Sequence, residues 1–185
     1  RCGVTGLRPT FGRVPRTGAM ALAWTMDKIG PMTRAVEDTA LVLDALNGAD
    51  GEDNCAIDMP FNFDATRRLR RLRVGYVAPD FRGRDTASTD RQALDELRKS
   101  GVDAAPIRLP AVSQRTLRPI VAVETAAAFD ELTRSDRDDL MVRQSANAWP
   151  NLFRTARMVP AVGYVQATRL RGRLFLTATP KLKPL

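Results

Sequence analysis

The sequence predicts an α/β fold in which a mixed, largely parallel sheet is covered by helices. Residues 72–77 and 105–110 are short runs rich in β-branched and apolar side chains, and residues 88–101 between them have helical periodicity. This strand, helix, strand order is typical of a parallel sheet with a right-handed crossover. Residues 33–48 have a second clear helical pattern, which places helices beside the sheet.

Residues 1–48 form a core segment of turns followed by one helix. Residues 1–32 carry five glycines and three prolines, which favour tight turns and short extended pieces over helix. From Thr33, a hydroxyl that can cap a helix is followed by acidic residues in the first turn, and Gly48 stands just past the end. The apolar residues of this helix fall on one stripe: Val36, Ala40, Leu43 and Leu46.

Residues 49–71 are rich in turn formers and have no period, which predicts a surface loop. The segment 72–173 then holds the strand–helix–strand unit and two or three further helices, in which prolines mark starts or kinks. Residues 174–185 form an atypical tail, because two prolines interrupt the helical pattern. We expect this tail to be poorly ordered, with a short terminal strand as the alternative. The four segments together form one partial domain over residues 1–185.

The composition excludes several classes of function. The chain is 44% hydrophobic and 27% charged, which excludes large-scale disorder. It has no histidine, so serine or cysteine nucleophiles activated by histidine are excluded, and its two cysteines cannot form a four-cysteine zinc site. We therefore predict no metal and no cofactor. No run approaches the ~18 apolar residues of a membrane span, and the sequence is interpreted as that of a cytoplasmic protein with reduced cysteines.

The chain is strongly basic, with a net charge of +8 and 25 arginines among its 29 basic residues. A dense cluster spans 67–73, which suggests an arginine-rich module that binds nucleic acid. Two leucines interrupt this cluster, however, and no aromatic residues alternate with it to stack on bases. A solvated basic edge is the simpler interpretation.

Two blocks near the start are the most specific motifs in the chain. Both resemble the amidase signature family, in which C-G-x-x-G-[LF]-[KR]-P-[ST]-x-G-R-[VI]-[SP] is followed by S-x-D-x-x-G-P-[ML]-[TA]-R-[ST]-[VA]-x-D. The segments Cys2–Thr10, Gly12–Val14 and Asp27–Asp38 match these patterns almost position for position. The resemblance continues more loosely through the 72–77 strand and through residues 142–171, so it spans most of the chain.

The resemblance implies the amidase signature fold, in part, and hydrolysis of carboxamide C–N bonds. In this family a lysine acts through a cis-peptide serine on a nucleophilic serine, and an acyl-enzyme forms. The nucleophile lies in G-G-S-x-R-x-P-A, immediately before the cysteine that corresponds to Cys2, and the other two groups lie further upstream. The triad therefore falls upstream of Arg1, no catalytic residue is assigned in this chain, and we expect the chain alone to be inactive.

The residues that remain are candidates for support. Asp27 resembles a family aspartate behind the active-site loop, where it would pair with an arginine, and a turn-forming aspartate is the equal alternative. Arg34 is a second candidate, although an i,i+4 pair with Asp38 on the helix surface is the simpler interpretation. Tyr76 and Trp149 are candidates for a substrate pocket, against the simpler interpretation of core packing.

The resemblance leaves the substrate and the partners open. Family members that use glutamine carry an arginine pair near the position of Asn151 and Leu152, so this chain fits a general amidase better than the glutaminase component of a tRNA-dependent amidotransferase. A small-molecule amide is the implied substrate. A homodimer is left open, as are partner subunits in the amidotransferase alternative.

Overall fold

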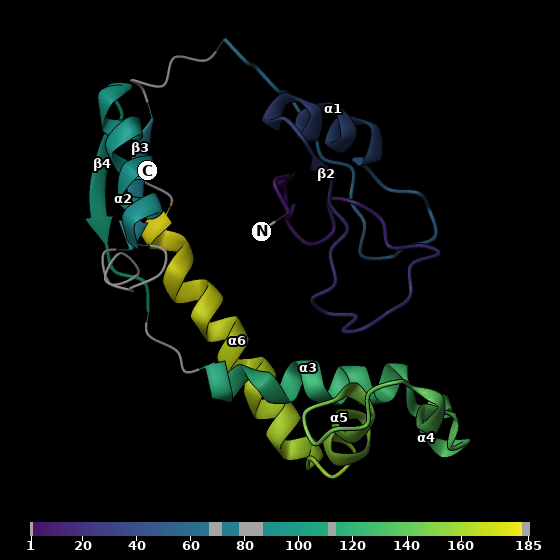
Figure 1. Ribbon diagram of the computed structural model, residues 1–185. Coiled ribbons are helices and arrows are strands. Elements are labelled where there is room, and N and C mark those ends of the chain that lie inside the picture. The colour runs from purple at the N-terminus through teal and green to yellow at the C-terminus, as the bar shows by residue number, and fades with distance from the viewer. Residues whose placement is uncertain (1, 67–71, 78–86, 111–113, 183–185) are drawn as a thin grey trace. The chain divides into compact units, whose positions relative to one another are not determined.

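The computed structural model describes residues 2–66, 72–77, 87–110 and 114–182. Within these ranges the chain forms two compact units, Arg1–Ala65 with Arg118–Tyr164 and Thr66–Leu117 with Val165–Leu185. Each unit contains a two-stranded sheet and helices, as labelled in Figure 1. The described residues thus combine helices with a parallel strand pair, which confirms the predicted α/β class.

The first unit begins with turns and a small antiparallel sheet of β1 (Thr5–Gly6) and β2 (Met32–Thr33). Gly30 stands close to the first strand, because a Cβ atom there would lie 2.1 Å from the Leu7 carbonyl oxygen. The absence of a side chain at this position therefore allows the backbone of residues 30–31 to approach that of Leu7, whose N–H donates to the Pro31 carbonyl. The prediction of turns and extended pieces over residues 1–32 is confirmed.

Helix α1 (Val36–Leu46) starts three residues later than the sequence predicted. Its N-cap is Ala35, which offers no side-chain hydrogen bond, and the Thr33 hydroxyl instead donates to the Ala35 carbonyl at 2.7 Å. Ala40 and Leu43 are buried as expected, whereas 65% of Val36 is exposed. The predicted cap at Thr33 is therefore wrong, because its hydroxyl is bonded outside the helix.

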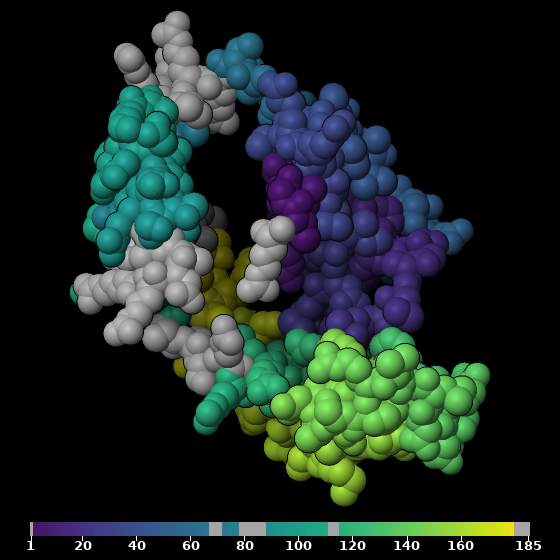
Figure 2. Space-filling view, viewed as in Figure 1, coloured from purple at the N-terminus to yellow at the C-terminus, as the bar shows by residue number. Residues whose placement is uncertain are grey.

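The part of the first unit from Arg118 onward is mainly helical. Its elements are α3 (Gln114–Ala128, shared with the second unit), α4 (Asp130–Arg134), the 3₁₀ turn η3 (Arg137–Leu140), α5 (Trp149–Ala156) and the first turn of α6 (Ala161–Leu182). Residues of α4 and α5 lie together, in green in Figure 2. The core here contains Ile120, Thr125 and Phe153, with Phe129 stacked on Phe153 at 4.8 Å between ring centroids. The sequence predicted two or three helices here and underestimated their number, because short helices of one or two turns carry too little periodicity.

The second unit contains the predicted strand, helix, strand unit. Strands β3 (Arg73–Val77) and β4 (Asp103–Ile107) pair in parallel, with Val74 opposite Ala104, and α2 (Ala87–Lys99) lies between them in the chain and packs against β4 (Figure 1). The parallel pair and its intervening helix are confirmed.

Helix α6 continues through residues 174–182, where the sequence predicted a poorly ordered tail or a short strand. The Thr177 hydroxyl donates to the Arg173 carbonyl at 2.6 Å, and the Thr179 hydroxyl donates to the Phe175 carbonyl at 2.8 Å. These local bonds are compatible with helix. The helix includes Pro180, one of the two prolines on which the prediction of a tail rested, so that prediction is wrong for residues 174–182. Residues 183–185 of the tail and 67–71 of the predicted loop lie outside the described ranges.

Candidate functional site

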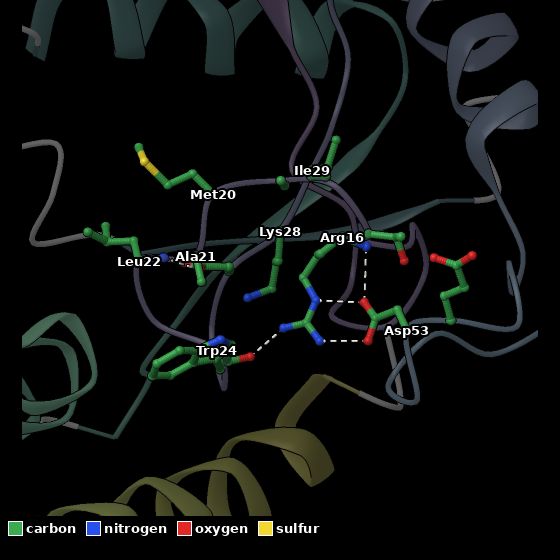
Figure 3. Close-up of a pocket in the computed structure, with 12 residues that line it drawn as sticks. Arg16, Met20, Ala21, Leu22, Trp24, Lys28, Ile29 and Asp53 are labelled. Carbon is green, nitrogen blue, oxygen red and sulfur yellow. Dashed lines mark hydrogen bonds and ion pairs between the residues drawn. The ribbon is translucent and has the colours of Figure 1, made fainter. Parts of the chain in front are cut away.

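A cavity of about 540 Å³ lies in the first unit, within the turns that follow the first motif block. Its apolar lining comes from Ala19, Met20, Ala21, Leu22, Trp24 and Ile29. Its charged lining comes from two segments of the chain, with Arg16, Asp27 and Lys28 in one and Glu52 and Asp53 in the other (Figure 3). The larger side chains among its lining residues include those of Arg16, Met20, Leu22, Trp24 and Lys28. The cavity therefore offers apolar and aromatic surface beside a few polar groups, as small-molecule sites do.

Arg16 and Asp53 fix one side of this cavity. The guanidinium donates two hydrogen bonds of 2.8 Å to the two carboxylate oxygens, and the Arg16 backbone N–H donates a third, of 3.0 Å. Figure 3 shows the same guanidinium between Asp53 and the carbonyl of Trp24, to which it also donates. The bond from Arg16 holds the pKa of Asp53 well below its usual range, and the same bond raises the pKa of Arg16. Because the guanidinium is hydrogen-bonded to Asp53 and to the Trp24 carbonyl, we assign Arg16 a structural role in the lining of the cavity.

Asp27 closes the turn of residues 22–27, which contributes Trp24 to the cavity lining. Its Oδ2 accepts hydrogen bonds of 2.8 Å from the backbone N–H groups of Leu22 and Ala23, and its own N–H donates to the Ala23 carbonyl. No ion pair of this carboxylate occurs among the residues that the structure describes. These bonds are what the turn-forming alternative predicts, and support of an arginine in the nucleophile loop stays a prediction.

Arg34 lies outside the cavity. It is exposed and precedes α1, so it is not on the helix that carries Asp38. The predicted i,i+4 pair is wrong for this reason, because two residues meet at that spacing only when both are helical.

Tyr76 and Trp149 belong to different units, and neither lines the cavity. Tyr76 is half-buried on β3, where its ring faces the Arg98 guanidinium at 5.7 Å. Trp149 is 45% exposed, stacks on Phe153, and borders a second cavity of about 290 Å³ formed by residues 141–150. Of the four predicted site residues, Asp27 alone lines the larger cavity.

Sequence reasoning missed the residues that make up most of the cavity. Met20 and Trp24 are large apolar residues in a segment with neither helical nor strand periodicity, and they remain 83% and 48% exposed. Large apolar residues that no period assigns to a core are a signal of a site, and it was available in the sequence. No comparable signal marked Arg16, whose partner lies 37 residues away.

The described residues also include the two cysteines and the end of the arginine cluster. Across the described ranges, no group of three or more His, Cys, Asp or Glu side chains is placed to hold a metal ion. The same ranges contain no helix with the length and apolar character needed to cross a membrane. Cys2 and Cys55 are exposed free thiols. Most of the arginine cluster at 67–73 lies outside the described residues, and Arg73 is exposed at the start of β3.

Comparison with solved structures supports the fold. A vestigial protein complex that bears on the evolutionary origins of an s-triazine catabolic enzyme superposes with a TM-score of 0.82 at 23% identity, over 99% of this chain and 40% of the other. A bacterial aryl acylamidase of the amidase signature family superposes with a TM-score of 0.71 at 20% identity, over 96% of this chain and 39% of the other.

Sequence comparison adds closer relatives. The A subunit of the glutamyl-tRNA(Gln) amidotransferase of Pelobacter propionicus is 37% identical over 142 residues, which are 73% of this chain and 29% of the relative. The chain thus spans under a third of the length of this curated relative. The family model described as Amidase matches residues 1–181. Because that match covers nearly every residue and includes both motif blocks and the cavity between them, the chain belongs to the amidase signature family.

Proposed function

We propose that this chain forms part of an enzyme that cleaves carbon–nitrogen bonds of carboxamides, and that the cavity of residues 16–29 and 52–53 receives part of the amide substrate. One observation carries the proposal. The second family motif block starts at Asp27, and its first three residues, Asp27, Lys28 and Ile29, line the cavity, so a family motif and a cavity of small-molecule size coincide. In family terms the acyl-enzyme would form on a serine in a G-G-S motif, which residues 1–185 do not contain.

The chain's own residues would bind and orient the substrate. Met20, Leu22 and Trp24 offer an apolar wall to the part of the amide that does not react, and they would keep water away from it. Arg16 is already paired with Asp53, which leaves it the role of holding the wall in shape. Lys28 donates to the Met26 carbonyl and faces the Phe11 ring at 5.8 Å, so its charge lies at the polar end of the cavity.

An amide-hydrolysis assay tests this proposal. The chain is joined at its N-terminus to the segment of a family relative that carries G-G-S-x-R-x-P-A, and ammonia release is measured with acetamide, benzamide and glutamine. We expect release from the joined protein, and background release from the 185-residue chain and from the joined protein with serine replaced by alanine in that motif. If the joined protein releases no ammonia while the relative's full-length protein does, the proposal is wrong.

The cavity is tested separately with matched tryptophan variants. Trp24→Ala should raise KM for benzamide by about ten-fold, which corresponds to the loss of one aromatic contact, and should affect acetamide less. Trp149→Ala, which removes the tryptophan outside this cavity, should leave both KM values within about two-fold. If Trp24→Ala and Trp149→Ala change KM for benzamide equally, the cavity does not bind the substrate.

A second candidate function is that of the glutaminase component of an amidotransferase, working with partner subunits in the cytoplasm. The curated relatives favour it, because the one named above and others at 32–41% identity are all components of glutamyl-tRNA(Gln) amidotransferases. Asn151 argues against glutamine recognition at the predicted arginine position, because its amide donates to the Gln144 and Ser145 carbonyls and holds a loop. Ammonia release from glutamine at more than about ten times the benzamide rate would favour this second function.

A further inference from the structure

Glu124 is a buried carboxylate that lies outside the cavity and is joined to its wall. It stands on α3 and is 5% exposed. Its Oε2 accepts a hydrogen bond of 3.1 Å from the Thr25 backbone N–H, and its Oε1 accepts one of 2.6 Å from the Thr25 hydroxyl. The Tyr164 hydroxyl, in the first turn of α6, donates to the same Oε1 at 3.0 Å. Both carboxylate oxygens are therefore engaged by donors.

Thr25 lies at the tip of the turn that forms the apolar wall. The preceding residue is Trp24, whose side chain lines the cavity and whose carbonyl accepts from Arg16. Two residues later, Asp27 closes the turn through the N–H groups of Leu22 and Ala23. The turn is thus held from within by Asp27, from one side by Arg16, and from α3 by Glu124.

The donors around Glu124 match a carboxylate. A glutamate side chain that accepts at both oxygens satisfies the N–H and O–H donors that face it. A glutamine can keep its one oxygen on the Thr25 N–H and donate its NH₂ group to the two hydroxyl oxygens, because a hydroxyl accepts as well as donates, so it is the conservative variant. A leucine offers no acceptor to the Thr25 N–H. A buried donor that loses its acceptor is costly, so the turn would move to satisfy it.

We propose that Glu124 is a positioning residue, which fixes Thr25 and thereby sets the place of Trp24 in the cavity wall. The consequence for catalysis rests on the proposed amidase function, whereas the consequence for the turn does not. Glu124 is not among the residues that line the cavity, so its effect on a substrate passes through Thr25 and Trp24.

Amide hydrogen exchange in the 185-residue chain tests the positioning directly. Glu124→Leu should increase the exchange rate of the Thr25 amide by about ten-fold or more, while the Leu43 amide in α1 keeps its rate. Glu124→Gln, which keeps an acceptor for this amide, should increase it much less. Thr25→Val removes the hydroxyl and keeps the backbone bond, so its amide at position 25 should stay protected. Glu131→Leu changes an exposed carboxylate on α4 and serves as the matched control. An unchanged Thr25 exchange rate in Glu124→Leu overturns the proposal.

Fluorescence reads the position of Trp24. The chain has two tryptophans, so Trp149→Phe leaves Trp24 as the one emitter. In that background Glu124→Leu should shift the emission and raise quenching by acrylamide, and Tyr164→Phe, which removes one donor and keeps the carboxylate, should do so less. If Glu124→Leu fails to fold, Glu124→Ala, which also removes both acceptors, decides the question. Identical emission and quenching in the variant and the parent would count against the proposal.

Kinetics in the joined protein separate this proposal from the proposed function. Glu124→Leu should raise KM for benzamide by about ten-fold and leave kcat within about two-fold, because the variant changes the wall and leaves the reacting groups intact. If the joined protein is inactive while exchange and fluorescence respond to Glu124→Leu, the amidase proposal fails and the positioning of Thr25 stands. If activity is present and KM does not change, Glu124 has no role in substrate fit.

Discussion

Arg16 and Asp53 meet through two parallel hydrogen bonds across 37 residues of sequence, and their side chains are 16% and 9% exposed. The pair joins the turns that follow the first motif block to the loop after α1. A bidentate arginine–carboxylate pair fixes both distance and orientation, which a lysine could not do. The loop that contains Asp53 is therefore part of the cavity, although the sequence predicted only a surface loop there.

The first prediction concerns acid stability. Asp53 has a lowered pKa in the folded chain, so the unfolded chain takes up the proton first as the pH falls below about 4. The stability that the pair contributes is present above this pH and is lost as the pH falls through the folded pKa. Asp53→Asn should lower Tm at pH 7 and flatten the fall of Tm between about pH 4 and 2. Thermal melts across this range measure both effects.

Asp44→Asn is the matched control for that experiment, because Asp44 is an exposed carboxylate on α1. It should keep both the parent Tm and the acid-induced fall. If Asp53→Asn and Asp44→Asn have the same pH profile, the ion pair with Arg16 does not govern acid stability.

The second prediction separates the two interpretations of Asp27. Asp27→Asn keeps an oxygen that can accept from Leu22 and Ala23, whereas Asp27→Ala leaves both N–H groups without their acceptor. Asp27→Ala should lower the free energy of unfolding by about 1–3 kcal/mol, and Asp27→Asn by less than about 1 kcal/mol. Urea denaturation measures both. In the joined protein, a kcat for Asp27→Asn that is about ten-fold below the parent would instead support the charge-assisted pair with an arginine.

The third prediction concerns the aromatic core of the first unit. Phe153 is 2% exposed and is stacked on Phe129, so Phe153→Ala should cost about 3–5 kcal/mol through the cavity that it leaves. Phe153→Leu fills more of that volume and should cost less. Trp149→Ala, at a ring that is 45% exposed, should cost markedly less than Phe153→Ala. Denaturant midpoints with equal shifts for Phe153→Ala and Trp149→Ala would contradict this account of the core.

The fourth prediction concerns Gly30. Its Cβ in Gly30→Ala would lie 2.1 Å from the Leu7 carbonyl oxygen and 2.6 Å from Pro9 Cδ, so backbone must move. We expect a loss of about 1–3 kcal/mol in the free energy of unfolding. Gly163→Ala is the control, because it lies in α6 with Val159 Cγ1 at an ordinary 3.9 Å. The free energy of unfolding of Gly163→Ala should rise by roughly 0.5–1 kcal/mol, because alanine has a higher helix propensity than glycine. If both variants lower the free energy of unfolding equally, crowding at Gly30 is not the cause.

The sequence predicted the elements with strong local patterns and missed what depends on distant partners. The apolar runs of β3 and β4 and the periodicity of α2 were sufficient for the parallel pair, because each signal lies within one element. The start of α1 was predicted at Thr33, because a hydroxyl before a helix is normally its cap, and the bond to Ala35 that competes with it is not visible in a sequence pattern.

The candidate site was less predictable for the same reason. Asp27 was found through a motif, and its bonds to Leu22 and Ala23 are local. Glu124 had no such signal, since a single carboxylate in a helix is usually solvated and its partner Thr25 lies 99 residues away. Tyr76 and Trp149 were chosen for residue type alone, and residue type does not determine which surface a side chain lines.

The bond between Thr25 and Glu124 also has a consequence for the order in which the protein folds. Contacts between residues far apart in sequence form late, because closing a long loop costs more entropy than forming a helix or a hairpin. The turn of residues 22–27 can close early through Asp27, yet it reaches its final place only when α3 has formed. In pulse-labelled refolding, we expect the Leu43 amide to gain protection before the Thr25 amide. The cavity would then be the last part of its unit to reach its native structure. Simultaneous protection of the Leu43 and Thr25 amides would contradict this order.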